Sequence, residues 1–350
     1  KEFNFDFNKQ LKSTIENQVG HYNVNTYKGF RNSSAKSFLK PIKNHSNLTI
    51  LTKTEVLKLN FKNNKISSLK IKHKDKTLEV KPKIGTILSS GSIMTPYLLL
   101  KSGIGNPVDL NKFNIPVVLN SPHVGKNFQD HLGLDYLYKT YFPTLNKDLG
   151  TWGGRLRSIL HYVYNRKGPL SLSLNQGGGY INWKSLDPYP NIQLYFNPLT
   201  YSVSFKNKRP LLRTDKFNGF IMGFNSCRPK SLGEVHLKNV DNNYLPSIDP
   251  KYLSDERDIH DLYSTFDFVR KFSLNNNIKD IIKSPVTIDP INLSDEELLE
   301  HFKSNATTIY HPCGTCRMSK DVSNGVVSER LKVHGLNNLW IVDASIMPNI

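Results

Sequence analysis

One histidine stands out among the residues that could perform acid–base chemistry. His311 lies in the glycine-containing segment 310–318, YHPCGTCRM, and an apolar run that ends at Asp343 follows it. A histidine titrates near neutral pH, so a loop that holds it in place can use it as a proton acceptor. Open α/β sheets bind cofactors beside the carboxyl ends of their strands, where we expect this segment to lie. His311 is therefore a candidate general base, and a purely structural loop histidine is the alternative.

Two cysteines beside His311 raise the alternatives of a redox site or a metal site. Cys313 and Cys316 have the Cys-x-x-Cys spacing that thioredoxin-like sites and zinc sites also use. The only other cysteine is Cys227, so no second pair exists to complete a zinc ribbon, and no βαβ pattern of the thioredoxin kind precedes the segment. We predict no metal site here and expect both cysteines to pack within the loop.

The charge of the chain is strongly positive but dispersed. The formal net charge is +18, and the lysines that produce it are spread along the sequence in short runs, such as the one over residues 70–76. Proteins that bind nucleic acids tend to cluster basic residues and to interleave them with aromatic residues or arginine. The composition therefore favours a solvated basic surface, and we predict no nucleic-acid partner.

The chain contains no apolar stretch long enough to span a bilayer. The longest, around residues 93–100, is interrupted by Thr95 and Pro96, so we predict no membrane span. The chain starts at Lys1 without a methionine and stops at Ile350 after a strand-like run, and we expect both ends to be cut from a longer protein. The localisation is unknown, and secretion is one option, since an upstream signal peptide would not be seen.

The first third of the sequence predicts a small sheet followed by a strand and a helix. Residues 47–80 alternate apolar and polar residues in short bursts, as in an antiparallel meander. A continuous apolar strand over 84–88 leads into Ser89-Ser90-Gly91-Ser92, and Thr95-Pro96 is expected to open a helix that ends at residue 101. This order suits a phosphate-binding unit, but the chain has no Gly-x-Gly-x-x-Gly motif.

The middle of the chain changes to aromatic-rich strands and amphipathic helices. Strands are expected around 192–196 and 217–221, and helices over 156–164, 255–271 and 295–303, the last with Ser294 as N-cap and Glu297 in a capping box. The triplet Gly177-Gly178-Gly179 is interpreted as a tight turn or as close packing against a cofactor ring, with the turn favoured. The apolar strand over 339–342 then predicts a return to the first sheet.

Several segments together resemble the glucose-methanol-choline (GMC) family of flavin oxidoreductases, and within it the arthropod glucose-dehydrogenase-like branch. The segments that carry the resemblance are GSIMTPYLLLKSGIG at 91–105, VGKNFQDH at 124–131, RNSSAKSFL at 31–39, LGEVHL at 232–237, PSIDP at 246–250 and the two segments that contain His311 and Asp343. They run through essentially the whole chain in the family's order.

The resemblance implies a mixed α/β fold in two domains. Residues 1–134 and 305–350 would form an incomplete, Rossmann-like FAD-binding domain built from discontinuous segments, in which the second part carries the catalytic loop. Residues 135–304 would form a substrate-binding domain with a β-sheet flanked by helices. The family's dinucleotide fingerprint has no counterpart here, so we expect a fragment that lacks the N-terminal FAD fingerprint and the extreme C-terminus.

The resemblance also assigns roles to four residues. Val56 would contact the adenine of FAD through its backbone, and Asp343 and Ala344 would lie along the ribityl and pyrophosphate part. His311 matches the family's catalytic histidine, while a second catalytic residue would follow Ile350. The remaining loop and strand histidines, His123, His131, His236 and His334, are given no chemical role.

The activity implied is the FAD-dependent oxidation of a CH–OH group in a small alcohol or sugar. His311 would take the hydroxyl proton while the C–H hydride passes to flavin N5. The electron acceptor, a quinone or oxygen, stays open. The alternative is a truncated, non-catalytic GMC-like protein that binds no flavin.

Overall fold

The computed structural model describes the chain except for residues 1–5, 9–10, 12–16, 205–210 and 242. The chain forms two compact units. Unit 1 comprises residues 1–48, 132–227 and 259–307, and unit 2 comprises residues 49–131, 228–258 and 308–350. These limits differ from the predicted domain limits, because residues 1–48 pack with the middle of the chain and residues 228–258 pack with its other segments. The functional assignment of the two predicted domains stays a prediction.

Unit 1 is built on a mixed sheet of eight strands. The order is β1-β2-β12-β13-β16-β11-β19, and β20 also pairs with β11. β1 and β2 pair in parallel, and the neighbouring strands from β2 to β19 in this order pair antiparallel. The bounds are β1 (Asp6–Asn8), β2 (Gln18–His21), β12 (Gly177–Ile181), β13 (Ile192–Asn197), β16 (Gly219–Ser226), β11 (Leu132–Thr140), β19 (Ile282–Pro285) and β20 (Thr307–Thr308). Two small hairpins complete the strands of the unit: β3 (Thr26–Tyr27) with β4 (Phe30–Arg31), and β14 (Tyr201–Ser204) with β15 (Leu211–Thr214).

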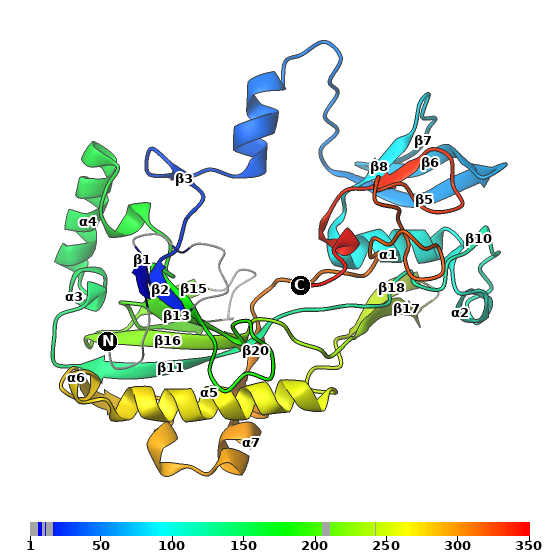
Figure 1. Cartoon of the computed structure of the whole chain (residues 1–350). Helices are drawn as coiled ribbons and strands as arrows, with labels where there is room; N and C mark the ends of the chain where they lie inside the picture. Colours follow the sequence, from blue (N-terminus) through cyan, green and yellow to red (C-terminus); the bar gives the residue numbers. More distant parts are fainter. Residues whose placement is uncertain (1–5, 9–10, 12–16, 205–210, 242) are drawn as a thin grey trace. The chain divides into compact units, whose positions relative to one another are not determined.

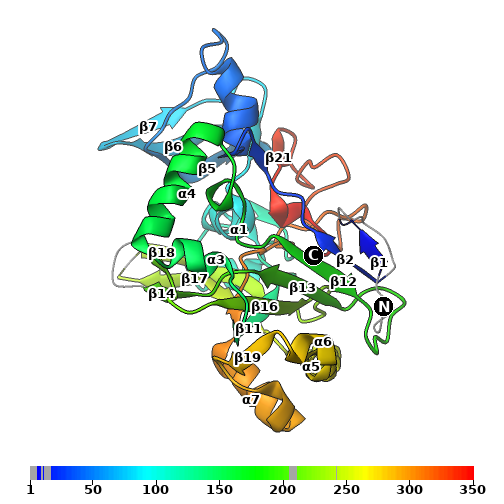
Figure 2. The same cartoon turned by 90° about the vertical axis from the view of Figure 1, so that its left-hand side faces the viewer.

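Helices cover one face of this sheet. In Figures 1 and 2, α5 (Glu256–Leu274) runs along the strands, and α7 (Asp295–Asn305) lies on the outer side of α5. Aromatic rings hold these layers together: Phe268 of α5 contacts Phe224 of β16, with ring centroids 6.0 Å apart. The other helices of the unit are α3 (Leu145–Leu149), α4 (Trp152–Asn165), α6 (Asn276–Lys279) and the short turns η1 (Ala35–Leu39), η2 (Lys40–Ile42), η3 (Pro169–Ser171) and η4 (Pro290–Asn292).

The three helices predicted in the middle of the chain are confirmed as α4, α5 and α7. The capping box of α7 is also confirmed, since Ser294 Oγ accepts from Glu297 N at 3.2 Å and Glu297 Oε2 accepts from Ser294 N at 2.8 Å. A capping box satisfies two backbone donors that would otherwise lack partners at a helix start. Local sequence therefore decides where α7 begins.

The prediction of a turn at the glycine triplet is wrong, because Gly177, Gly178 and Gly179 form the first part of strand β12. This strand is hydrogen-bonded on both sides, to β2 and to β13. A Cβ on Gly178 would lie 2.0 Å from the carbonyl oxygen of Leu194. The glycines therefore serve close packing of backbone in the sheet rather than reversal of the chain.

Substitution of Gly178 by alanine is expected to lower the free energy of unfolding by about 1–3 kcal/mol, because the added methyl group overpacks β12 against β13. The matched control is Gly153→Ala in α4, where a Cβ would meet nothing within 4 Å and alanine favours the helix. Urea unfolding followed by circular dichroism measures both variants. Equal stability of the two would contradict the packing role of Gly178.

Unit 2 contains the predicted meander and a pair of parallel strands, one of which lies near the C-terminus. The meander is confirmed as β5 (Thr54–Lys62), β6 (Lys65–His73) and β7 (Lys76–Val80). Strand β21 (Leu339–Ile341) pairs in parallel with β8 (Thr86–Leu88), which confirms the predicted return of the C-terminal segment. The remaining elements are α1 (Gly91–Lys101), β9 (Ile104–Gly105), α2 (Pro107–Asn111), β10 (Leu119–Asn120), β17 (Glu234–Val240), β18 (Asn243–Asp249) and η5 (Ala344–Ile346). Leu99, Ile104 and Leu339 are fully buried in the core of this unit.

Helix α1 begins four residues before the predicted opening at Thr95-Pro96. Pro96 thus lies inside the helix, where it has no N–H to donate to the carbonyl of Ser92. That carbonyl oxygen accepts a 2.6 Å hydrogen bond from Thr315 Oγ1 instead. The proline therefore creates an acceptor on α1 for the segment that carries His311.

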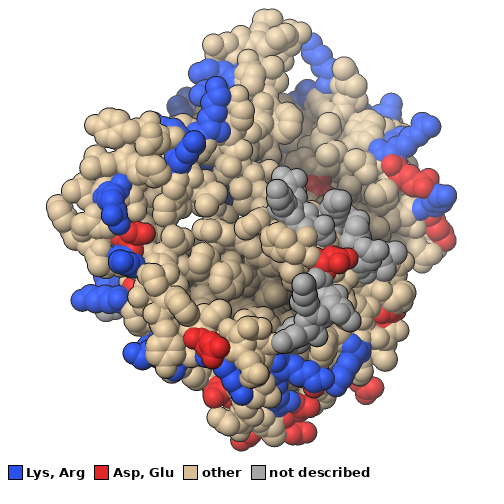
Figure 3. Space-filling view, turned by 60° about the vertical axis from the view of Figure 1, so that its left-hand side comes forward, with Lys and Arg blue, Asp and Glu red and all other residues tan. Residues whose placement is uncertain are grey.

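On the face drawn in Figure 3, Lys and Arg are scattered, and Asp and Glu lie among them. Among the described residues, no helix combines the length and the apolar character that crossing a bilayer requires.

Candidate active site

The segment that carries His311, residues 308–316, is called the His311 loop below. It is held by backbone hydrogen bonds to residues 129–131, which directly precede β11. Gln129 and Cys313 exchange two such bonds, of 3.1 and 2.9 Å, and the N–H of Ile309 donates to the carbonyl of His131 at 3.1 Å. The loop is thus fixed as if it were a short strand, although residues 309–316 lie outside the helices and strands.

A buried carboxylate lies under the His311 loop. Asp130 is 5% exposed, and its Oδ1 accepts from the backbone N–H groups of both His131 and His311, at 3.0 and 2.9 Å. Its Oδ2 accepts from the Tyr252 hydroxyl at 2.6 Å and from Thr308 Oγ1 at 2.5 Å. A buried carboxylate needs such donors, because no water replaces them. Burial and the adjacent Asp130 together raise the pKa of the Tyr252 hydroxyl, which keeps it a donor.

The imidazoles of His131 and His311 meet directly. Their Nδ1 atoms are 3.2 Å apart, and the ring centroids are 5.5 Å apart with planes at 75°. Two imidazole nitrogens at this distance share one hydrogen, so one donates and the other accepts. The His311 side chain is solvent-exposed, so it can reach a small molecule.

The sequence interpretation gave His131 no chemical role and did not consider Asp130 or Tyr252. The available signal was the VGKNFQDH motif at 124–131, which ends in an aspartate and a histidine directly before a strand. Adjacent acidic and imidazole groups at a strand start are candidates for a site. Their proximity to His311, 180 residues away, could not be seen in the sequence.

Asp343 and Ala344 lie beside the His311 loop. The N–H of Gly314 donates to the carbonyl of Ala344 at 3.2 Å. Asp343 caps η5, because its Oδ1 accepts from Ser345 N at 2.9 Å and from Ser345 Oγ at 2.5 Å. The structure therefore brings His311, Asp343 and Ala344 together within unit 2.

The second carboxylate oxygen of Asp343 serves the start of α1. It accepts from Gly91 N at 3.0 Å and from Thr95 Oγ1 at 2.6 Å. A carboxylate at a helix N-terminus is favoured by the helix dipole. With two donors on each oxygen, the carboxylate has all its acceptor positions in use.

Val56 lies in β5, away from the hydrogen bonds of the His311 loop. An apolar residue in a strand is expected to face the core, but Val56 is 37% exposed. The physical reason is a register shift between Val56 and Lys58, where one extra residue changes which side chains face inward. Leu59, beyond the shift, is 1% exposed.

Cys313 and Cys316 are free thiols that pack inside the His311 loop, 2% and 0% exposed. Burial raises the pKa of Cys313 to about 11 and also raises the pKa of Cys316. Redox-active cysteines of the thioredoxin kind have lowered pKa values instead. No group of three or more His, Cys, Asp or Glu side chains in the described part of the chain has a geometry that could hold a metal ion.

A thiol reagent should distinguish these packed cysteines from reactive ones. At pH 8 only about one in a thousand Cys313 side chains would be a thiolate, so we expect a disulfide reagent to modify at most one of the three thiols, Cys227, in the native protein. Labelling of Cys313 should rise as the pH approaches 11. All three should react in denaturant. Fast modification of Cys313 at pH 7 would contradict this assignment.

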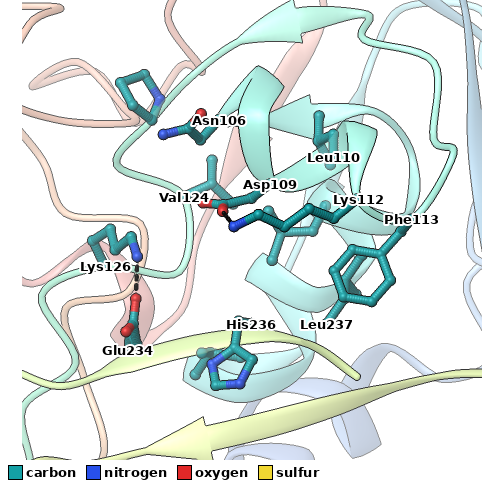
Figure 4. Close-up of a pocket in the computed structure, with 13 residues that line it drawn as sticks. Asn106, Asp109, Leu110, Lys112, Phe113, Val124, Lys126, Glu234, His236 and Leu237 are labelled. Atoms are coloured by element: carbon teal, nitrogen blue, oxygen red, sulfur yellow. Dashed lines mark hydrogen bonds and ion pairs between the residues drawn. The ribbon is translucent and has the colours of Figure 1, made fainter. Parts of the chain in front are cut away.

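A separate pocket of about 300 Å³ lies in unit 2 between α2 and β17. Figure 4 shows Lys126 and Glu234 facing each other at its rim, where they form an ion pair, and Leu110, Phe113 and Leu237 contribute apolar surface. The hydrogen bond from Lys126 lowers the pKa of Glu234. None of the predicted site residues lines this pocket.

Two family models match the chain, and both are described as GMC oxidoreductase. One matches residues 1–133 and the other residues 229–350, so together they cover well over half of the chain. Two separate segments of the chain are thus matched to the same family.

Curated relatives and solved structures match nearly the full length of the chain. An alcohol dehydrogenase (acceptor) of Pseudomonas putida is 33% identical over 352 residues, which is 100% of this chain and 62% of that protein. An oxygen-dependent choline dehydrogenase of Cronobacter sakazakii is 32% identical over 93% of this chain and 57% of its own length. The crystal structure of pyridoxine 4-oxidase from Mesorbium loti matches with a TM-score of 0.82 and 26% identity, over 100% of this chain and 63% of that one. The chain thus spans about three fifths of the length of these proteins.

Proposed function

Because this chain belongs to the GMC oxidoreductase family, we propose that it is part of an FAD-dependent enzyme that oxidises the CH–OH group of a small alcohol or sugar. The observation that carries the proposal is the placement of His311. Its imidazole is exposed, its backbone is fixed by Asp130, and its Nδ1 is engaged by His131. A base fixed in this way can take a hydroxyl proton without reorganising.

In the proton-transfer step, His311 is the proton acceptor. The alcohol O–H bond breaks, and its proton goes to Nε2 of His311, while the C–H bond gives up a hydride and a carbonyl forms. Bound FAD would supply the hydride acceptor. The substrate carbon must therefore lie between His311 and the cofactor, and the rigid His311 loop fixes one side of that arrangement.

The residues around Gly91 suit the approach of a cofactor. The strands β8 and β21 are parallel, so Gly91 and Asp343 follow their carboxyl ends at the same edge of the sheet, where open α/β folds bind ligands. A Cβ at Gly91 would meet nothing within 4 Å, which leaves open space beside the backbone. We propose that Asp343 and Ala344 contact FAD through their backbone, because the Asp343 carboxylate is already saturated with donors. Val56 is proposed to contact the adenine.

Several finer assignments belong to the same proposal. The relatives named above are bacterial enzymes, so placement in the arthropod glucose-dehydrogenase-like branch rests on the sequence motifs. We propose unit 2 as the FAD-binding part and unit 1 as the substrate-binding part, since the His311 loop and Asp343 lie in unit 2. The electron acceptor is a quinone or oxygen.

Reconstitution with FAD tests this proposal. We expect the purified protein to bind FAD with a flavin absorbance band, and an alcohol or sugar to bleach that band under anaerobic conditions. Comparison of glucose with choline and with primary alcohols identifies the substrate class. A chain that binds no flavin at any FAD concentration would support the alternative, a non-catalytic GMC-like protein.

A further inference from the structure

We propose that His131 is a positioning residue that holds His311 in the tautomer whose Nε2 carries the lone pair. The inference rests on the proposed function, because it concerns the state that a general base requires. The observation is the 3.2 Å approach of the two Nδ1 atoms.

Only one arrangement of hydrogens in this pair suits a base. A neutral imidazole carries one N–H, so a hydrogen on Nδ1 of His311 leaves Nε2 with a lone pair, and a hydrogen on Nε2 leaves none there. If His311 Nδ1 donates to His131 Nδ1, the Nε2 of His311 can accept a proton. If the hydrogen bond runs the other way, His311 is the acceptor and its own hydrogen sits on Nε2. His131 must therefore be the acceptor for His311 to act.

The backbone fixes this pair at short range. Asp130 Oδ1 accepts from the N–H groups of both histidines, at 3.0 and 2.9 Å, so one oxygen anchors both residues. The N–H of Ile309 adds a bond to the carbonyl of His131. In the part of the chain that the structure describes, no hydrogen bond involves Nε2 of His311, so this atom stays available for a substrate.

An orienting acceptor behind a catalytic imidazole is a familiar device in chemistry. A histidine that acts through one ring nitrogen usually has its tautomer set by the hydrogen bond of the other. A carboxylate often fills that place, but here Asp130 binds backbone N–H groups and hydroxyls instead. The neighbouring imidazole takes the role.

The tautomer can be measured without flavin. In protein labelled with ¹⁵N-histidine, long-range ¹H–¹⁵N correlation spectra distinguish an Nδ1–H imidazole from an Nε2–H one, and His311→Gln identifies the signals of His311. We expect Nδ1–H for His311 in the unmodified chain. His131→Leu, which removes the acceptor at similar size, should abolish that state, and His131→Asn, whose amide oxygen can accept, should restore it.

Flavin reduction provides the second readout. We expect His131→Leu to lower the rate constant of reduction about 10- to 100-fold with little change in substrate affinity, and His131→Asn to recover most of the loss. His236→Leu, at an exposed histidine of β17, is the matched control and should leave the rate as it is.

The two hypotheses fail in different ways. A His311 that carries Nε2–H in the unmodified chain, or keeps Nδ1–H in His131→Leu, would overturn the role of His131 whatever the activity is. Normal flavin reduction in a His311 variant would overturn the proposed function, but it would leave the tautomer result standing.

Discussion

Substitution of His311 by alanine is expected to lower the rate constant of flavin reduction by about 10²- to 10⁴-fold, with flavin binding retained. The alcohol would then have to lose its proton to water, a weak base that no residue positions. The His311 side chain is exposed and its Nδ1 has a single partner, so its removal leaves little unsatisfied in the fold. Anaerobic stopped-flow at the flavin absorbance band measures the rate constant.

Two further measurements make the His311 result specific. The control variant His236→Ala lacks an exposed imidazole elsewhere in unit 2. We expect flavin reduction in this variant to proceed at the unmodified rate. Imidazole added to the solution should partly restore the rate of flavin reduction in His311→Ala, since the space left by the side chain opens to solvent. A His311→Ala protein that reduces flavin as fast as the unmodified one would rule out the general-base assignment.

Substitution of Asp130 by alanine is expected to lower the free energy of unfolding by about 3 kcal/mol or more. The carboxylate is 5% exposed and accepts four hydrogen bonds, from His131, His311, Tyr252 and Thr308. Without it, two backbone N–H groups and two hydroxyls lose their partner in a place that water reaches poorly. Chemical unfolding of the full chain measures the loss of stability. The rate of flavin reduction should also fall, since the His311 loop loses its hydrogen bonds to Asp130.

Partial variants separate the four bonds of Asp130. Tyr252→Phe removes one hydroxyl and keeps the ring, so we expect it to lower the free energy of unfolding by about 1 kcal/mol. The surface control is Asp109→Ala, which removes an ion pair with the exposed Lys112 and should change stability little. If Asp130→Ala unfolds no more easily than Asp109→Ala, the buried carboxylate does not anchor the loop.

Local signals in the sequence were sufficient for many elements of the fold. The capping residues Ser294 and Glu297 fix the start of α7, and alternation of apolar residues identifies the β5–β7 meander. These features depend on residues within a few positions of one another. The prediction for the glycine triplet at 177–179 was wrong because the conformation of these residues depends on strands β2 and β13, which flank them only in the folded chain.

The sequence by itself determined the family, most of the element types and His311 as the candidate base, because each of these depends on motifs of a few adjacent residues. Only the tertiary structure decided how that base is held. Asp130 and His131 meet the His311 loop across about half of the chain, and Thr315 finds the carbonyl that Pro96 frees on α1. Hydrogen bonds between distant backbone segments are set by the packing of the whole unit, and no local pattern encodes them.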